Sequence, residues 1–272
     1  MTAASAFGSL FAVSKPIIGM IHVLPQLGTP FFGGSLNAVI DRAVQDAQQL
    51  EAGGVDGILI QNRGDKAFAK DNSAPEIIAS MTRVGLAVMN AVNIPVGFHL
   101  LRNDVIGSLA VAQVCGGHFI RVGCGIGATY LPQGIVEAKP SEVMAARARY
   151  SAEKLVMLSD VESFHYRAVV PIPAEEVAQE LLSLGLADAV VVALPDNQAM
   201  LARITSIKAR TPSLPVLIGG YATANTIAAL LREADGAIVG GEFEQGGRNG
   251  PVVLNRVQHF MDQVYRCRAE LA

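Results

Sequence analysis

Short apolar runs alternate with amphipathic helical patterns eight times along this chain, and this alternation limits its fold more than any other feature. Each apolar run has the length of one strand and is bounded by glycine, proline or charged residues. A run of this kind followed by a helix predicts a strand buried on both faces of a parallel sheet. Eight such units in 272 residues predict an α/β protein with a single (β/α)8 TIM barrel, because about 250 residues are typical of that fold.

The expected elements follow one another without a linker. The expected strands are residues 15–22, 55–61, 95–101, 117–122, 155–160, 188–193, 216–220 and 236–241. The expected helices are residues 36–51, 75–91, a segment after Asp104, 141–153 with Ser141 as N-cap, 174–184, 198–209, 223–232 and 252–268. Residues 123–140 are expected to form a long glycine-rich loop. Residues 1–14 form an N-terminal extension, either frayed or plugging the barrel floor.

An open, doubly wound sheet is the alternative architecture. It would normally carry a glycine-rich fingerprint after its first strand. Here the first expected strand ends in His22, and the glycine pairs come late in the chain. The sequence therefore favours the closed barrel.

Composition excludes several classes of function. The formal net charge is -3, which gives no basic field to hold a nucleic-acid backbone. No apolar run approaches the ~20 residues that cross a bilayer, and the N-terminus lacks the basic region of a secretory signal. Three cysteines, Cys115, Cys124 and Cys267, without a CxxC motif favour a reducing cytoplasm over disulfides or a zinc site.

Two glycine pairs are the most specific functional signal. Gly219-Gly220 and Gly240-Gly241 end the seventh and eighth expected strands. The loops after the last two strands of such barrels often form a phosphate cup, and backbone without side chains lets N–H groups approach an anion. A helix beginning at Thr223 would add further donors. Tight turns alone could require these glycines, but we predict phosphate binding.

Polar residues gather just past the other expected strands, where barrels of this type carry their chemistry. These residues are expected to form a polar ring around the barrel mouth. Besides the candidates discussed below, the ring includes Gln61, Asp104, Glu162, Asp196, Asn197, Glu242 and Arg248. Asp160 and His165 are the candidate acid–base pair, and Asp65 and His22 are further catalytic candidates. An unpaired carboxylate ending an apolar strand is costly, so Asp160 requires an arginine, a metal or a substrate hydroxyl as partner. The alternative for His22 is a buried histidine bonded to backbone.

Arg102 and Arg121 are the candidate anion ligands, because a guanidinium offers paired donors to phosphate or carboxylate. Arg121 has an equally supported alternative, an ion pair inside the barrel with Asp160 or Asp65. The sequence leaves both open.

Asn62 and Asn103 are candidates for orienting the substrate. Asn103 and Asp104 could also cap the helix that follows them, and we favour the cap for Asp104. A divalent metal such as Mg²⁺ held by Asp65 and Asp160 is a further option, although no ligand motif supports it.

Several motifs together resemble the BtpA/SgcQ family. They are KPIIGMIHVLP at residues 15–25, GGVDGI at 53–58, NRGD at 62–65, LRND at 101–104, FIRV at 119–122, SDV at 159–161, ADGAIVG at 234–240, and RV at 256–257 followed by FM at 260–261. The resemblance covers residues 15–262 and implies a phosphate-binding type of TIM barrel. It also implies either a presumed enzyme of sugar metabolism or a link to biogenesis of photosystem I.

The chain departs from the family pattern at three places. Ile60-Gln61-Asn62 stands where the family usually has Val-Glu-Asn, Phe164-His165 stands where it tends to have Lys-His, and Ala-Leu-Pro-Asp at 193–196 replaces a Thr-Gly stretch. These differences remove a carboxylate and a lysine from the expected site. They imply a changed substrate or a specialised member.

Two functions from different classes follow. The first is an enzyme acting on a small phosphorylated or anionic metabolite, a sugar phosphate or nucleotide-like compound, with lyase, isomerase and glycosyl hydrolase or transferase chemistry all open. The second is a non-catalytic assembly or stability factor for a photosynthetic or other membrane complex. We expect a homo-oligomer, because barrels of this type often dimerise.

Overall fold

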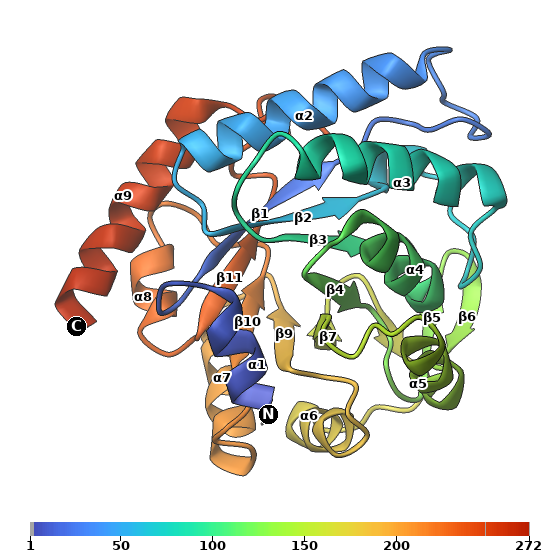
Figure 1. Cartoon of the computed structure of the whole chain (residues 1–272). Helices are drawn as coiled ribbons and strands as arrows, with labels where there is room; N and C mark the ends of the chain where they lie inside the picture. Colours follow the sequence, from blue (N-terminus) through green and yellow to red (C-terminus); the bar gives the residue numbers. More distant parts are fainter. Residues whose placement is uncertain (1–2, 248, 272) are drawn as a thin grey trace.

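Eight parallel strands close into a barrel in a computed structural model that describes residues 3–247 and 249–271. The strand order around the barrel is β1-β11-β10-β9-β7-β4-β3-β2, which follows the chain (Figure 1). The strands are β1 (Ile17–His22), β2 (Gly57–Gln61), β3 (Val96–His99), β4 (Phe119–Val122), β7 (Val156–Ser163), β9 (Ala189–Ala193), β10 (Val216–Gly219) and β11 (Gly236–Val239). The predicted (β/α)8 barrel is confirmed. Arg248 of the expected polar ring lies outside the described residues.

Eight helices surround the strands in the described part of the chain. They are α2 (Leu36–Ala52), α3 (Pro75–Met89), α4 (Val105–Cys115), α5 (Pro140–Arg149), α6 (Ala174–Ser183), α7 (Asn197–Arg210), α8 (Ile227–Leu231) and α9 (Leu254–Leu271). The Asp104 side chain caps α4 by accepting from the Gly107 amide at 2.8 Å, as expected. Within the described ranges, each helix is too short or too polar to span a membrane.

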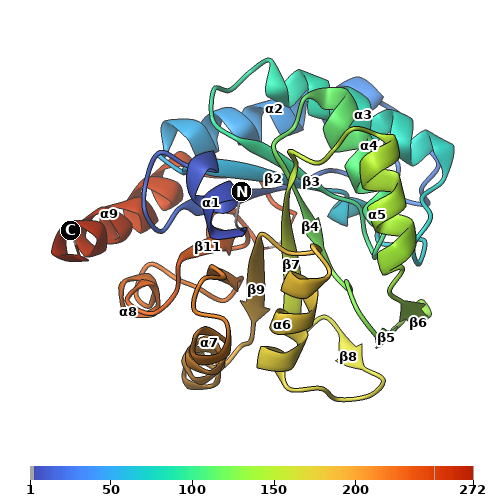
Figure 2. The ribbon, with the colours of Figure 1, turned by 60° about the horizontal axis from the view of Figure 1, so that its bottom comes forward.

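The N-terminal segment packs beneath the barrel. Phe7 of α1 (Ala3–Leu10) and Phe11 just after it join one apolar cluster with inward-facing residues of the strands. The rings of Phe11 and Phe119 lie 6.3 Å apart, centroid to centroid. Figure 2 shows α1 lying across the end of the barrel. Of the two arrangements expected for this segment, the structure has the one that closes the floor.

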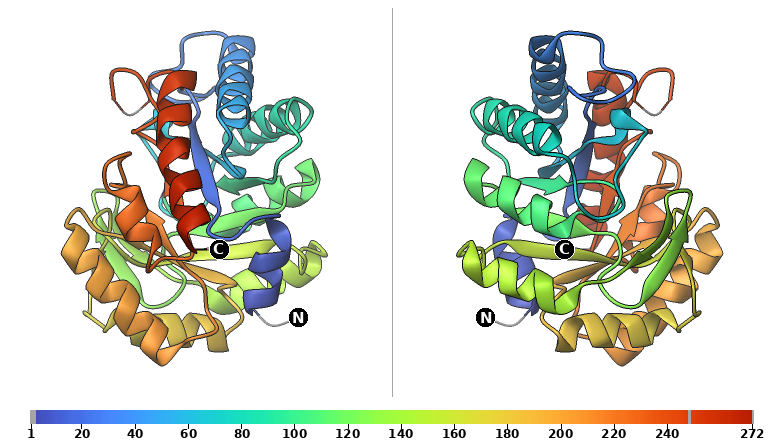
Figure 3. Two further views of the ribbon diagram at one scale, coloured as in Figure 1. Left: turned by 90° about the vertical axis from the view of Figure 1, so that its left-hand side faces the viewer. Right: turned by 90° about the vertical axis from the view of Figure 1, so that its right-hand side faces the viewer.

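The segment expected to be a loop after β4 contains regular structure. Residues 128–131 (β5) and 134–137 (β6) form an antiparallel hairpin, and β8 (Arg167–Ala168) pairs with β5. Figure 3 shows this hairpin at the end of the barrel opposite α1. The prediction missed it because each strand has only four residues and the surrounding sequence is rich in glycine.

Two predicted helix starts are wrong. Helix α8 begins at Ile227 rather than Thr223, because the Thr223 amide donates to Thr226 Oγ1 at 3.0 Å in a local turn. Helix α5 begins at Pro140, so Lys139 rather than Ser141 occupies its N-cap position.

Candidate functional site

A pocket lies at the carboxyl end of the barrel, where the inward-facing side chains change from apolar to polar. Side chains alternate along a strand, so positions two residues beyond the apolar floor again face inward. Around the ring these positions are His22, Gln61, His99, Arg121 and Asp160 on five neighbouring strands. On the other three they are Ala193, Gly219 and Gly240, the last of which directly follows β11. Small residues on one half leave space opposite large polar residues on the other. The pocket has a volume of about 370 Å³, which suits a small metabolite.

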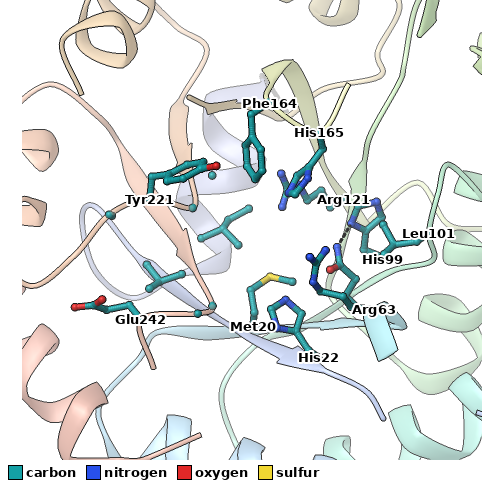
Figure 4. A pocket seen from close by; sticks show the side chains of 18 of the residues that line it. Met20, His22, Arg63, His99, Leu101, Arg121, Phe164, His165, Tyr221 and Glu242 are labelled. Atoms are coloured by element: carbon teal, nitrogen blue, oxygen red, sulfur yellow. Dashed lines mark hydrogen bonds between the residues drawn. The ribbon is translucent and has the colours of Figure 1, made fainter. Parts of the chain in front are cut away.

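Positively charged side chains are concentrated on one side of the pocket. Figure 4 shows Arg63 and Arg121 on one side, with Glu242 and Tyr221 across from them. Arg102 also lines the pocket, and its guanidinium lies 4.9 Å from the centroid of the Phe68 ring. Among the described residues, Glu242 is the only one with a carboxylate side chain that lines the pocket. The pocket is therefore asymmetric in charge.

Arg121 and Asp160 form a buried, bidentate ion pair. Arg121 Nε donates to Asp160 Oδ1 at 2.9 Å and Nη2 donates to Oδ2 at 3.0 Å. Burial alone would lower the pKa of Arg121, but the Asp160 carboxylate more than offsets this and raises it. The structure thus selects the ion-pair alternative for Arg121, which lines the pocket as well.

This ion pair engages the carboxylate of Asp160, the residue expected to act with His165 as an acid–base pair. Both of its oxygens accept from Arg121. Asp160 lines a neighbouring cavity beneath the β5–β8 sheet, whereas His165 lines the main pocket. The geometry does not bring Asp160 and His165 together at one ligand.

His22 lines the pocket and has a carboxylate behind it. Its Nδ1 lies 2.5 Å from Oε1 of Glu244, which is 1% exposed. The other oxygen of Glu244 accepts from the Asn249 amide at 3.0 Å. Because an ionised carboxylate only accepts hydrogen bonds, it holds the His22 proton on Nδ1 and leaves Nε2 as a proton acceptor. This is the arrangement of a general base.

The two glycine pairs differ in what their backbone can do. Both pairs line the pocket, but the Gly220 amide donates to the Ile238 carbonyl at 3.0 Å and Gly219 belongs to β10. The prediction that the Gly220 amide binds an anion is therefore wrong. In the second pair, the Gly240 carbonyl accepts from Phe243 at 2.8 Å and closes a turn. Among the described residues, the Gly241 amide donates to no backbone carbonyl, so it is a candidate donor to a ligand.

Glu242 occupies part of the expected phosphate cup. Its Oε1 accepts from the Ala224 amide at 3.1 Å, and the Thr223 amide is held by Thr226. The backbone amides of Thr223 and Ala224, which were expected to bind an anion at the start of a helix, are thus already bonded within the protein. A carboxylate at this position would repel a phosphate group, so the side of the pocket that suits an anion is the one lined by arginines.

Asp65 and Asn62 hold the loop after β2 and do not line the pocket. Asp65 accepts from the Gln26 amide, from Gln26 Nε2 and from Asn62 Nδ2 at 2.9 to 3.1 Å. Asn62 Oδ1 in turn accepts from the Leu101 amide at 2.8 Å. These bonds hold the loop that carries Arg63.

Asn103 has a similar supporting role. Its Nδ2 donates to the Cys124 carbonyl at 3.0 Å, and its Oδ1 accepts from the Cys124 amide at 2.8 Å. It therefore links the loops after β3 and β4, and its side chain does not line the pocket.

Metal binding by Asp65 and Asp160 finds no support in the arrangement of these side chains. Each carboxylate is engaged by separate donors, as described above. Among residues 3–247 and 249–271, no three histidine, cysteine, aspartate or glutamate side chains are grouped as ligands for an ion.

The model of one protein family, the BtpA family, matches residues 13–266. The chain belongs to the BtpA family. It is 33% identical over 258 residues to the photosystem I biogenesis protein BtpA of Synechocystis, covering 93% of this chain and 88% of that protein. It is 34% identical over 246 residues to an uncharacterized protein of Pyrococcus furiosus, covering 90% and 92%.

The fold of this BtpA-family chain is shared with TIM-barrel enzymes. Phosphoribosyl anthranilate isomerase from Thermococcus kodakaraensis superimposes with a TM-score of 0.52 at 14% identity, over 92% of this chain and 98% of that enzyme. At this identity, the likeness concerns the fold alone.

The sequence-based reasoning missed several lining or supporting residues of this BtpA-family pocket. They are Arg63, His99, Tyr166 and the carboxylate partner Glu244. His99 could have been found from alternation, since Gly97 and His99 share a face of β3. Glu244 lies 222 residues from His22, and no local pattern joins two such positions.

Proposed function

We propose that this BtpA-family barrel is an enzyme acting on a small phosphorylated or anionic metabolite, such as a sugar phosphate or nucleotide-like compound. The observation that carries the proposal is the charge asymmetry of the pocket. Arg63, Arg102 and Arg121 line it, and Figure 4 shows Glu242 across from Arg63 and Arg121. A guanidinium at the mouth of a barrel offers paired donors to phosphate or carboxylate.

The shared fold supports this proposal in a general way. Phosphoribosyl anthranilate isomerase has a name that describes a phosphorylated substrate, and TIM barrels carry their active sites at the carboxyl ends of the strands. In this chain the anion would bind at Arg63 and Arg102, with the Gly241 amide as a further donor, instead of in a full glycine cup.

Proton transfer would fall to histidines that line the pocket. His22 is oriented by Glu244 at 2.5 Å, and His165 lies across from it on the loop after β7. Imidazole is the side chain that exchanges protons most readily near neutral pH. We assign His22 as the base and His165 as the second acid–base candidate, in place of Asp160.

Ligand-induced stabilisation tests the proposal. The wild type, Arg102→Gln and the matched control Arg83→Gln are melted with inorganic phosphate and a panel of sugar phosphates. Arg83 is exposed on α3, away from the pocket. A ligand at 100 times its Kd stabilises the native state by about 2.7 kcal/mol, which raises Tm by roughly 5–10 °C in a chain of this size. Arg102→Gln should lose most of this rise, and Arg83→Gln should keep it. Equal behaviour of the two variants, or no rise with any ligand, would count against the proposal.

A non-catalytic assembly role is the second candidate, favoured by one feature of the surface. Exposed apolar side chains gather around β5, β6 and β8, namely Tyr130, Ile135, Val169, Val170 and Ile172. If this face binds a partner, a Val170→Ser/Ile172→Ser variant should fail to complement a deletion strain while Arg102→Gln complements it. The enzyme proposal expects the opposite pattern.

A further inference from the structure

Three neighbouring strands place polar side chains in one row inside the barrel. In the register of β1, β2 and β3, His22 lies opposite Gln61, and Gln61 lies opposite His99. Neighbouring strands are about 4.8 Å apart, so His22 and His99 flank Gln61 with about 10 Å between their backbones. The two imidazoles face one pocket from either side of an amide.

Gln61 fixes where His99 carries its proton. Gln61 Nε2 lies 2.9 Å from His99 Nδ1. An amide nitrogen only donates, so Nδ1 must accept, and the neutral ring then carries its hydrogen on Nε2. His22 has the reverse arrangement, since Glu244 holds its proton on Nδ1.

The Nε2–H group of His99 lacks an acceptor. His99 is 2% exposed, and its Nε2 is buried with no hydrogen-bond partner among the described residues. Leaving a buried donor unsatisfied costs about 1–3 kcal/mol, and native proteins rarely leave one without a reason. The side chain lines the pocket, so an oxygen of a bound ligand can supply the missing acceptor.

The groups around His99 keep its ring neutral. Arg121 on β4, Arg102 after β3 and His165 after β7 face it, and Gln61 is its neighbour on β2. Burial and then the repulsion of these positive groups hold the pKa of His99 well below its ordinary value. A neutral imidazole donates a hydrogen bond without giving up its proton.

We propose that His99 is a fixed neutral donor whose Nε2–H binds an oxygen of the ligand, with Gln61 as the positioning residue that sets its tautomer. The inference rests on the proposed function, because the ligand must be rich in acceptor oxygens. It narrows the substrate class to a phosphorylated carbonyl compound that carries both a hydrogen and a hydroxyl group on the carbon next to the carbonyl.

The two histidines then divide one proton-transfer step. His22 Nε2 accepts the proton from the carbon next to the carbonyl, and the electron pair of that C–H bond becomes a C=C bond. The carbonyl π pair moves onto its oxygen, where the His99 Nε2–H stabilises the charge. The proton of a hydroxyl group on the neighbouring carbon then moves to this oxygen, and the hydroxyl oxygen that lost it forms the new C=O bond. The C=C electron pair takes the proton back from His22 at the former carbonyl carbon, so carbonyl and hydroxyl have changed places with atoms and charge conserved.

NMR of the imidazole nitrogens tests the tautomer without any ligand. The full chain is labelled with ¹⁵N and followed from pH 5 to 8, and the His99 signals are those that His99→Gln removes. We expect protonated Nε2, unprotonated Nδ1 and no titration in this range. In Gln61→Glu, the new carboxylate should accept a hydrogen bond from Nδ1–H. It should raise the pKa of His99, with at least a tenfold gain in the proton affinity of the ring. Protonated Nδ1 in the wild type, or no change in Gln61→Glu, would overturn the inference.

Two additions keep the test decisive. If Gln61→Glu does not fold, Gln61→Met removes the amide donor, and a single unchanged Nε2–H tautomer there would refute the role of Gln61. Inorganic phosphate is then added to the wild type, and the His99 Nε2–H signal should move. A shift of His165 without a shift of His99 means that His99 does not face the ligand. A shift of neither refutes the proposed function and the donation together, while the tautomer is still read from the ligand-free spectra.

Discussion

Replacing Asp160 by asparagine should destabilise the barrel far more than breaking an ion pair on its surface. Asp160 and Arg121 are 6% and 8% exposed and share two hydrogen bonds. Asparagine keeps nearly the same shape but leaves the guanidinium buried without its counter-charge. Removing one partner of a buried pair costs about 3–5 kcal/mol. Because the asparagine oxygen can retain one bond, we expect about 3 kcal/mol.

The magnitude is large against the whole stability of a protein, about 5–15 kcal/mol. It corresponds to a fall in Tm of roughly 6–12 °C for a chain of this size. Urea unfolding followed by far-UV circular dichroism measures the change in midpoint. The matched control is Glu270→Gln, which breaks the pair with Arg232 whose side chains are 53% and 58% exposed. An exposed pair contributes at most about 1 kcal/mol.

A double variant separates charge burial from packing. Arg121→Met with Asp160→Leu replaces both charges by apolar side chains, and such replacements are often neutral or stabilising. We expect it to be more stable than Asp160→Asn. If Asp160→Asn costs no more than Glu270→Gln, water reaches the pair and the reasoning fails.

Two further predictions concern the core. A Cβ added at Gly97 would overlap the ring of Phe119, so Gly97→Ala should lower the free energy of unfolding by about 1–3 kcal/mol. The control is Gly8→Ala, whose added Cβ meets no neighbouring atom and should not lower it. Equal midpoints of urea unfolding for the two variants would contradict this prediction. Burial raises the pKa of the Cys115 thiol from 9.0 to about 11. The folded state therefore keeps its proton where the unfolded chain loses it, and stability falls as pH rises from 9 to 11, by about 3 kcal/mol for two pKa units. Cys115→Ala should show a shallower fall over that range, and an identical slope would refute the assignment.

The barrel could be predicted from the sequence because its signal is local. Each apolar run is short, ends at a turn residue and is followed by a helical pattern, and eight repeats close the sheet. The short hairpin of β5 and β6 escaped because four-residue strands carry little periodicity. The cap at Asp104 was predictable because the bond that Oδ1 accepts from the Gly107 amide joins residues only three apart in the sequence.

The site was predictable only in part. Expecting polar side chains at the strand ends located the end of the barrel where the pocket lies and several lining residues, including His22, Arg102 and the glycine pairs. The roles assigned to Asp160 and Gly220 depended on partners from other strands, which the local pattern does not contain.

The sequence by itself determined the order of strands and helices and the face of the barrel on which polar side chains collect. It did so because side-chain direction alternates with every residue of a strand, whatever the rest of the chain does. Only the tertiary structure decided which groups are already satisfied: Arg121 by Asp160, His22 by Glu244, and the Gly220 amide by Ile238. Those pairings arise when the strands close into a ring, and closure brings together residues that are distant in the chain.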